Sequence, residues 1–361
     1  MRKPFSEDEM QVLGFYNSFI PGKPSALKLN SPISVKENTM LAFNGKRPMW
    51  YPNVGMIGGD YLPFRPRMFE DNYLARSIMD GEPPINWEGI SMIQPSWFDT
   101  IWKYEPIAGG ALPVPGSQKI DDINDWPILS WPDLDVYDWE GCAKANAAYL
   151  NTELPIEFGI ACGYWERLMA ILPVTEAAVA LVDESCKGAV HSFFDKLTDL
   201  YEDLLKRIKK YFNPDIVLLH DDWGHQRSIF FSEETCREMI FPYFKRFVDI
   251  VHGLGMRFEL HCCGKAEPLV EVMIDSGVDL WCPQTMNDTV RLAKEYRGEG
   301  ITFGVRLDPI PPEVPDEVAY EAAAKLVDTY GDGPVAYLNY GGSMKLYEYM
   351  YKLSRQAYDP A

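Results

Sequence analysis

The chain has 361 residues, of which 47% are hydrophobic and 13% aromatic, and its formal net charge at pH 7 is −19. This composition can bury a large core and excludes wholesale disorder, while the negative charge argues against nucleic-acid and anionic-membrane partners, which attract basic surfaces. Seven cysteines in so long a chain do not indicate a disulfide framework, and no apolar run is long enough to span a bilayer. We therefore expect one reduced, cytoplasmic, globular domain over residues 1–361.

The first part of the chain is expected to form an N-terminal helical extension over residues 1–40. Within it, SEDEMQVLGFYNSFI (6–20) has an amphipathic helical pattern. The SVKE segment (34–37) has the spacing of a capping box and predicts a short helix. Residues 82–135 are rich in Pro, Gly, Trp and Asp, and the recurring aromatics indicate long ordered loop excursions rather than a flexible linker.

After residue 150, apolar strand-like segments alternate with helical segments, as in parallel sheets that are buried on both faces. The six strand candidates are LPIEFGIAC (154–162), DIVLLHDD (215–222), MRFELHCC (256–263), VDLWCPQ (278–284), ITFGVRLDP (301–309) and PVAYLNYGG (334–342). Two earlier candidates, PMWYPNV (48–54) and EGISMI (88–93), bring the strand–helix units to eight. The sequence therefore predicts an α/β fold, a (β/α)8 TIM barrel with an N-terminal extension and long loops. An open doubly wound sheet is the alternative, although no G-x-G-x-x-G motif follows a strand.

Soft metal ligands gather in ELHCCGK, at the end of one predicted strand. Active sites of barrels lie at the carboxyl ends of the strands. Alternation along the strand puts Glu259, His261 and Cys263 on one face and Cys262 on the other. Imidazole and thiolate at this spacing suit zinc. The alternative is a buried cysteine pair beside a histidine that a neighbour satisfies.

Two ligands need a third, and the next strand offers one. Cys282 ends that strand, and adjacent parallel strands lie about 4.8 Å apart, so its side chain is predicted to point to the same centre. Glu259, on the same face of its strand but one layer deeper, is the competing candidate.

Charged residues follow several of the other strands. Asp221 and Asp222 end the strand before ELHCCGK, and adjacent desolvated carboxylates suit general acid catalysis or the binding of a cationic or hydroxyl-bearing ligand. In the alternative interpretation, one aspartate caps the following turn. Glu166 follows the third strand and is a further catalytic candidate, while Arg65 and Arg67 could meet a carboxylate ligand.

Three segments of the chain resemble the uroporphyrinogen decarboxylase superfamily. They are LLHDDWGHQRSIFFSEETCREMIFPYFKRFVDIVHGLG, ELHCCGKAEPLVEVMIDSGVD and GVRLDP. The resemblance runs from about residue 33 to the C-terminus and is strongest over residues 215–310. It implies a (β/α)8 barrel. The H-x-C motif at His261 and Cys263 is similar to that of the corrinoid-dependent methyltransferases, whereas decarboxylases begin with an arginine-rich segment that this chain lacks.

This resemblance implies a zinc-dependent methyltransferase with O-demethylation as one form of the reaction. The methyl group would move between a small methylated or methoxylated substrate, or a thiol, and a corrinoid (cobalamin) carried by a partner protein. The family takes its third zinc ligand from a later cysteine, but Tyr340 stands near that place here. Gln284, Asn339 and Tyr340, near later strand ends, are expected to contact the cofactor.

The partner corrinoid protein is expected to dock at the barrel mouth, where the 82–135 excursions are candidates for the rim; the resemblance also leaves a homodimer open. Two other functions remain at this point. One is a decarboxylase-like lyase in which Asp221 or Asp222 polarises a carboxylated ring. The other is a non-catalytic barrel that binds a corrinoid or metabolite without turnover.

Overall fold

The computed structural model describes residues 4–16, 26–55, 59–69, 71, 78–83, 92–105, 110–339 and 342–359. Seven parallel strands form the main sheet. In sheet order they are β12 (Val335–Leu338), β11 (Thr302–Arg306), β10 (Leu280–Trp281), β9 (Arg257–His261), β8 (Ile216–His220), β7 (Ile156–Ile160) and β3 (Leu62–Phe64). A parallel bridge between Asn53 and Tyr337 adds one more segment beside β12. The predicted (β/α)8 barrel fold is confirmed.

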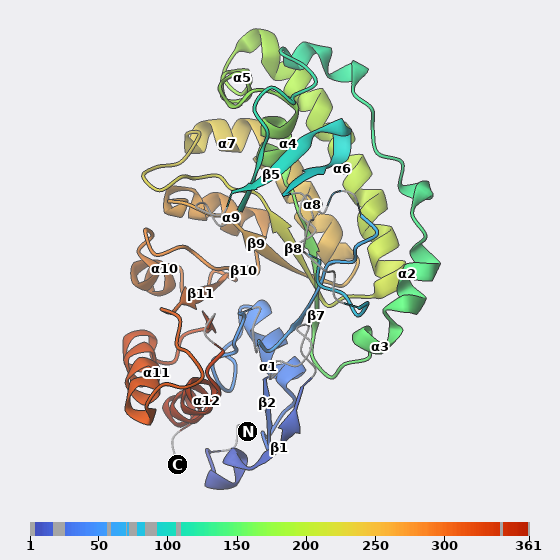
Figure 1. Ribbon diagram of the computed structural model, residues 1–361. Helices are drawn as coiled ribbons and strands as arrows, with labels where there is room; N and C mark the ends of the chain where they lie inside the picture. The colour runs from blue at the N-terminus through green and yellow to red at the C-terminus, as the bar shows by residue number, and fades with distance from the viewer. Residues whose placement is uncertain are drawn as a thin grey trace.

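Helices follow the strands along the chain and cover the outside of the sheet (Figure 1). The first, α1 (Val35–Phe43), begins after Ser34, whose side chain accepts a hydrogen bond from the Glu37 backbone N–H, as the sequence predicts. The other helices are α2 (Trp139–Ala145), α3 (Ala147–Leu150), α4 (Tyr164–Ile171), α5 (Val174–Ala180), α6 (Glu184–Phe212), α7 (Glu233–Met239), α8 (Phe241–Gly253), α9 (Val270–Ser276), α10 (Thr289–Glu295), α11 (Asp316–Tyr330) and α12 (Met344–Tyr358).

The predicted helix in the N-terminal extension is wrong. A single 3-10 turn (Glu7–Met10) is followed by β1 (Val12–Phe15), which pairs antiparallel with β2 (Leu27–Leu29). The amphipathic pattern of residues 6–20 cannot reveal this pairing because the partner strand lies further along the chain. Residues 17–20 of the predicted helix lie outside the described residues.

The second barrel strand was also misplaced by the sequence pattern. The sequence places this strand at residues 88–93, but β3 is the strand that lies beside β7 in the main sheet. Ile93, at the end of the 88–93 segment, belongs to β4 (Ile93–Pro95). That strand pairs antiparallel with β5 (Ile101–Glu105), which pairs with β6 (Gly110–Pro113). The 82–135 excursions therefore contain a small sheet of their own, in teal beside α4 in Figure 1.

Side chains of the barrel strands alternate between two environments. Outward residues such as Phe158, Val217 and Phe258 join the main core between sheet and helices. Inward residues such as Ile216 and Leu280 form a separate apolar cluster inside the barrel. Because the alternation continues to the carboxyl end of each strand, the last inward residues of the strands line the mouth of the barrel.

Within the described part of the chain, no helix combines the length and the apolar character needed to cross a membrane.

A buried ion pair joins the two ends of the described chain. The Arg355 guanidinium donates from Nε and Nη2 to the Glu9 carboxylate at 2.8 and 2.7 Å, and the Tyr351 hydroxyl donates to the same carboxylate at 2.7 Å. Arg355 is fully buried and Glu9 nearly so. The N-terminal turn is thereby held against α12.

We predict that Arg355→Met lowers the free energy of unfolding by about 3–5 kcal/mol, because it leaves the Glu9 carboxylate buried without its cation. Urea denaturation followed by circular dichroism measures this loss. The matched control is Lys352→Met, on the same helix as Arg355. This change removes an exposed ion pair with Glu7 and should cost less than about 1 kcal/mol. Equal losses in the two variants would contradict the assignment.

Candidate metal centre

The ends of β8 and β9 are joined at the mouth of the barrel. His220 and His261 are paired in the parallel register, and their rings lie 4.4 Å apart between centroids. The Asp221 backbone N–H donates to the His261 carbonyl at 2.9 Å, and the Cys263 backbone N–H donates to Asp222 Oδ1 at 2.6 Å. Asp222 therefore faces the same side as His261 and Cys263.

Three potential metal ligands come together there. One ligand atom each from Asp222, His261 and Cys263 lies within 4.8 Å of the other two. His261 Nε2 is 3.1 Å from Cys263 Sγ and 4.0 Å from Asp222 Oδ1. Metal–ligand distances of 2.0–2.3 Å in a tetrahedral zinc site give ligand–ligand distances of about 3.3–3.8 Å. The nitrogen, sulfur and oxygen donors thus fit zinc in type, and the two distances from His261 lie within a few tenths of an ångström of this spacing.

The pKa values of His261 and Cys263 bear on whether the group can bind a cation. Burial lowers the pKa of His261, which keeps the imidazole neutral, as a metal ligand must be. Burial, followed by the negative charges of Asp222 and Glu166, raises the pKa of the Cys263 thiol. A divalent cation bound there would lower the pKa of the Cys263 thiol instead, because it stabilises the thiolate directly.

A pair of side-chain amides holds the Cys263 turn. Gln284 Nε2 donates to Cys263 Sγ at 3.2 Å, and its Oε1 accepts from the Gly264 N–H at 2.8 Å. Asn287 Nδ2 donates to the Gly264 carbonyl at 2.9 Å, and its Oδ1 accepts from the Glu267 N–H at 2.9 Å. Gln284, predicted to contact the cofactor, thus contacts the thiol that could bind the metal.

Cys282, the predicted third ligand, is not part of this group. Its thiol lies 3.9 Å from Glu259 Oε1, and a Cβ built on Gly304 would lie 2.2 Å from its Sγ. The side chain therefore occupies the space above Gly304 in the neighbouring strand. Glu259, the competing candidate, lies deeper inside the barrel with Cys282, so Asp222 occupies the third position of the group.

The two adjacent aspartates have different surroundings. Asp221 is fully buried and accepts hydrogen bonds from the backbone N–H groups of Tyr164, Trp165 and Glu166 and from Trp223 Nε1. It therefore caps the first turn of α4, and burial raises its pKa to about 6. A substrate cannot reach this carboxylate without breaking the cap, so Asp222 is the aspartate that faces the mouth.

Glu166, the other catalytic candidate, lies against the metal ligands. Its Oε1 accepts from the Asp222 backbone N–H at 3.3 Å. Burial, followed by the charges of Asp222 and Asp221, raises its pKa well above the ordinary range for a glutamate. Burial beside two other carboxylates therefore favours the protonated form of Glu166, which is the form that a general acid needs.

The remaining predicted residues lie elsewhere. Asn339 follows β12 and is buried beside Asn53, whose Oδ1 accepts from the Asn339 backbone N–H at 3.4 Å. Tyr340 lies outside the described residues. Arg67 donates from Nε and Nη2 to the Asp80 carboxylate at 2.8 and 2.6 Å, and is therefore engaged within the fold.

Sequence reasoning missed Glu157, which forms a second polar layer inside the barrel together with Arg65 and Glu259. Arg65 lies across Gly159, and its Nη2 is 3.7 Å from Glu157 Oε1. Burial, followed by the charge of Glu157, raises the pKa of Glu259 well above its ordinary range, and burial likewise raises the pKa of Glu157. The signal for Glu157 was present in the sequence, because it is an acidic residue at an inward position of an otherwise apolar strand.

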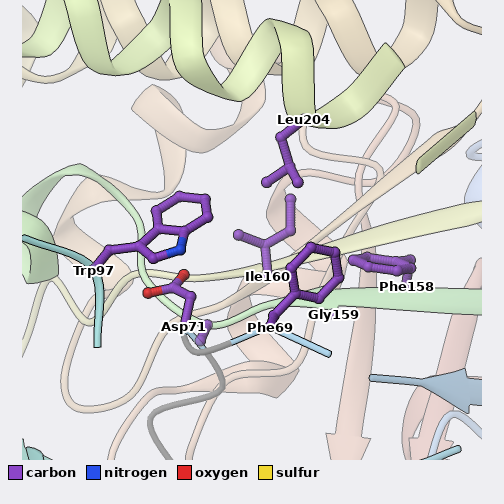
Figure 2. Close-up of a pocket in the computed structure, with 8 residues that line it drawn as sticks. Phe69, Asp71, Trp97, Phe158, Gly159, Ile160 and Leu204 are labelled. Atoms are coloured by element: carbon purple, nitrogen blue, oxygen red, sulfur yellow. The ribbon is translucent and has the colours of Figure 1, made fainter. Parts of the chain in front are cut away.

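A small pocket lies on the outer face of β7 (Figure 2). Phe69, Phe158, Ile160 and Leu204 give it an apolar wall, and Trp97 and Asp71 lie together at one side. The Asp71 carboxylate is already paired with the buried Arg167 guanidinium. This pocket is separated from the metal group by the strand itself, since Phe158 and Ile160 belong to the outward set.

Comparison with known proteins supports the fold. No known family profile and no curated protein matches the sequence. Among solved structures, a methyltransferase from Methanosarcina mazei matches with a TM-score of 0.55 and 11% identity over 90% of this chain and 98% of that chain. A B12-independent methionine synthase from Shewanella sp. W3-18-1 matches with a TM-score of 0.41 and 13% identity over 69% of this chain and 70% of that chain. The match to the methanogen protein shows that the two chains share a barrel fold.

We predict that Asp221→Ala lowers the free energy of unfolding by at least about 3 kcal/mol, because several buried N–H donors lose a charged acceptor. Thermal and urea unfolding measure this change. Asp308→Ala, at an exposed position after β11, is the control and should change stability by less than about 0.5 kcal/mol. A mild effect of Asp221→Ala would mean that the cap does not hold α4 in place.

Proposed function

We propose that this protein is a zinc-dependent methyltransferase that moves a methyl group between a small methylated or methoxylated compound and a corrinoid protein. The observation that carries this proposal is the group formed by Asp222, His261 and Cys263 at the carboxyl ends of two adjacent barrel strands. The fold match to a methyltransferase and the resemblance of the H-x-C motif support the reaction class.

The proposed ligands leave room for a reacting atom. Three protein ligands are typical of catalytic zinc, which keeps one position open for substrate. Bound zinc would supply a Lewis acid for the leaving oxygen or sulfur and would hold Cys263 as thiolate. Asp222 and Cys263 would carry the negative charge of the site, and His261 would stay neutral.

Glu166 has the protonation and the position for an acid in this reaction. Its carboxyl group lies against the Asp222 backbone, and burial together with the neighbouring carboxylates raises its pKa and favours the protonated form. When an oxygen or sulfur leaves the transferred methyl group, negative charge develops on that atom. We assign to Glu166 the donation of a proton to this leaving group.

The small sheet of β4, β5 and β6 is our candidate for the docking surface of the corrinoid protein. Trp102 packs it against Cys162 and Ala170, which places it at the carboxyl end of β7. Its outer face exposes Ile93 (48%) and Leu112 (55%) on either side of Lys103, with which both are paired. An apolar rim next to the mouth suits a protein that must present its cofactor to the site.

Metal analysis tests the site. We predict about one zinc ion per chain in protein purified under reducing conditions and reloaded with zinc, and loss of this zinc in His261→Ala, Cys263→Ala and Asp222→Ala. Removing one donor of a three-residue site should abolish tight binding. Inductively coupled plasma mass spectrometry after dialysis against a weak chelator gives the stoichiometry.

Cys282→Ser is the matched control, because it changes a thiol near the group that is not among its donors. This variant should keep its zinc. Retention of zinc in Asp222→Ala together with its loss in Cys282→Ser would make Cys282 the third ligand instead. A wild-type protein that never retains zinc would sink the methyltransferase proposal and favour a lyase.

A separate prediction concerns Gln284, which donates to the Cys263 sulfur. Gln284→Leu should lower the affinity for zinc by about 10–100-fold, because outer hydrogen bonds orient and stabilise metal ligands. Competition with a chromophoric chelator measures the affinity. With Co²⁺ in place of zinc, the thiolate-to-metal absorption band should also shift. Gln226→Leu, at an exposed position in the loop after β8, should leave both unchanged.

A further inference from the structure

Two glutamates inside the barrel have acceptor atoms without hydrogen-bond partners. Three carboxylate oxygens have no hydrogen-bond partner among the described residues: both oxygens of Glu157 and Oε2 of Glu259. Glu157 is fully buried and Glu259 is 5% exposed. Arg65, 7% exposed, reaches Glu157 only at ion-pair distance, and its Nε also has no partner there.

These atoms are costly where they are. A buried polar atom left without a hydrogen bond costs about 1–3 kcal/mol, and a charged one costs more. Most such atoms in native proteins are satisfied by protein, water or a bound molecule. The three oxygens without a partner come from two separate strands and face the same interior. A group that carries several hydrogen-bond donors could therefore bind to them together.

The chemistry of that group follows from the count. A primary ammonium carries three N–H donors and a positive charge, which matches three vacant carboxylate oxygens. The Arg65 guanidinium lies at ion-pair distance from Glu157, whereas the Glu259 carboxylate accepts a hydrogen bond from the Cys282 thiol. Among the described residues, no cation lies within ion-pair distance of Glu259.

The position of this layer also sets the length of the ligand. Glu259 and His261 are inward residues two positions apart on β9, so the metal group lies about 6–7 Å further along the strand. A short chain of two carbons and an ether oxygen between the ammonium and a methyl group covers most of this distance.

We propose that Glu157 and Glu259 form a binding site for the primary ammonium group of a small ligand whose methoxy end reaches the metal group. Calling this ligand the substrate rests on the methyltransferase function proposed above, whereas the ammonium site itself does not. The site adds to the metal group a second, deeper recognition element that selects ligands by charge.

The test compares two probes of nearly equal size, 2-methoxyethylammonium and 2-methoxyethanol, which differ in the charged end alone. Isothermal titration calorimetry with the full chain, as purified and after EDTA treatment, measures their binding. We expect the ammonium compound to bind at least about tenfold more tightly. Glu259→Gln and Glu157→Gln should each raise its dissociation constant by at least about tenfold, while Glu299→Gln, at an exposed position, should not change it.

Equal binding of the two probes, or binding of neither, would overturn the ammonium site and leave water as the partner of these carboxylates. Binding that survives both glutamine substitutions but is lost in Asp222→Asn would also overturn it, because the cation would then sit at the mouth. The EDTA-treated protein separates the two proposals. Ammonium binding that persists after EDTA treatment shows that the ammonium site does not need the metal. A protein that binds the ammonium compound but never retains zinc when reloaded refutes the methyltransferase site alone, and zinc binding without ammonium binding refutes the ammonium site alone.

Discussion

The Asp221 carboxylate is the contact on which the mouth of the barrel depends. It joins the end of β8 to the first turn of α4, because it accepts from three backbone N–H groups there. With α4 held in this way, Glu166 reaches the Asp222 backbone, and Asp222 in turn accepts from the Cys263 backbone. Hydrogen bonds thus run from α4 through β8 to β9, and the metal group lies at their far end. The cap adds no ligand atom, yet it sets the position of each candidate ligand.

The polar interior gives a second constraint. Alternation along the strands sends Ile216 and Leu280 to an apolar floor and sends Glu259 and His261 to the layers above it. Buried charge destabilises a fold unless it is paired. A barrel that keeps Glu157, Glu259 and Arg65 away from water therefore gives up stability for recognition, and it can do so because the surrounding helical core is large.

Much of this architecture could be predicted from the sequence, and the failures have physical causes. Long apolar strands separated by amphipathic helices have a strong local signal, so the later strands were found in order. The second strand was missed because β3 has three residues, one of them proline, and shows no period. The face shared by His261 and Cys263 follows from period-2 alternation alone. The part played by Asp222 requires the register between β8 and β9, and the orientation of Cys282 depends on the space above Gly304; neither is encoded in a local pattern.

In the proposed site, a carboxylate takes the place that a second thiolate would have in a site of one histidine and two cysteines. Asp222, Cys263 and a neutral His261 would bring two negative charges to a divalent cation, as a histidine with two thiolates would, so the net charge is unchanged. A carboxylate oxygen is a harder donor than sulfur and transfers less electron density, which leaves the metal a stronger Lewis acid toward oxygen. Cys263 would then be the one thiolate, and the hydrogen bond from Gln284 would further reduce the electron density that its sulfur gives to the metal. Both effects favour the activation of an ether oxygen over that of a thioether, in agreement with a methoxy group as the reacting end of the ligand.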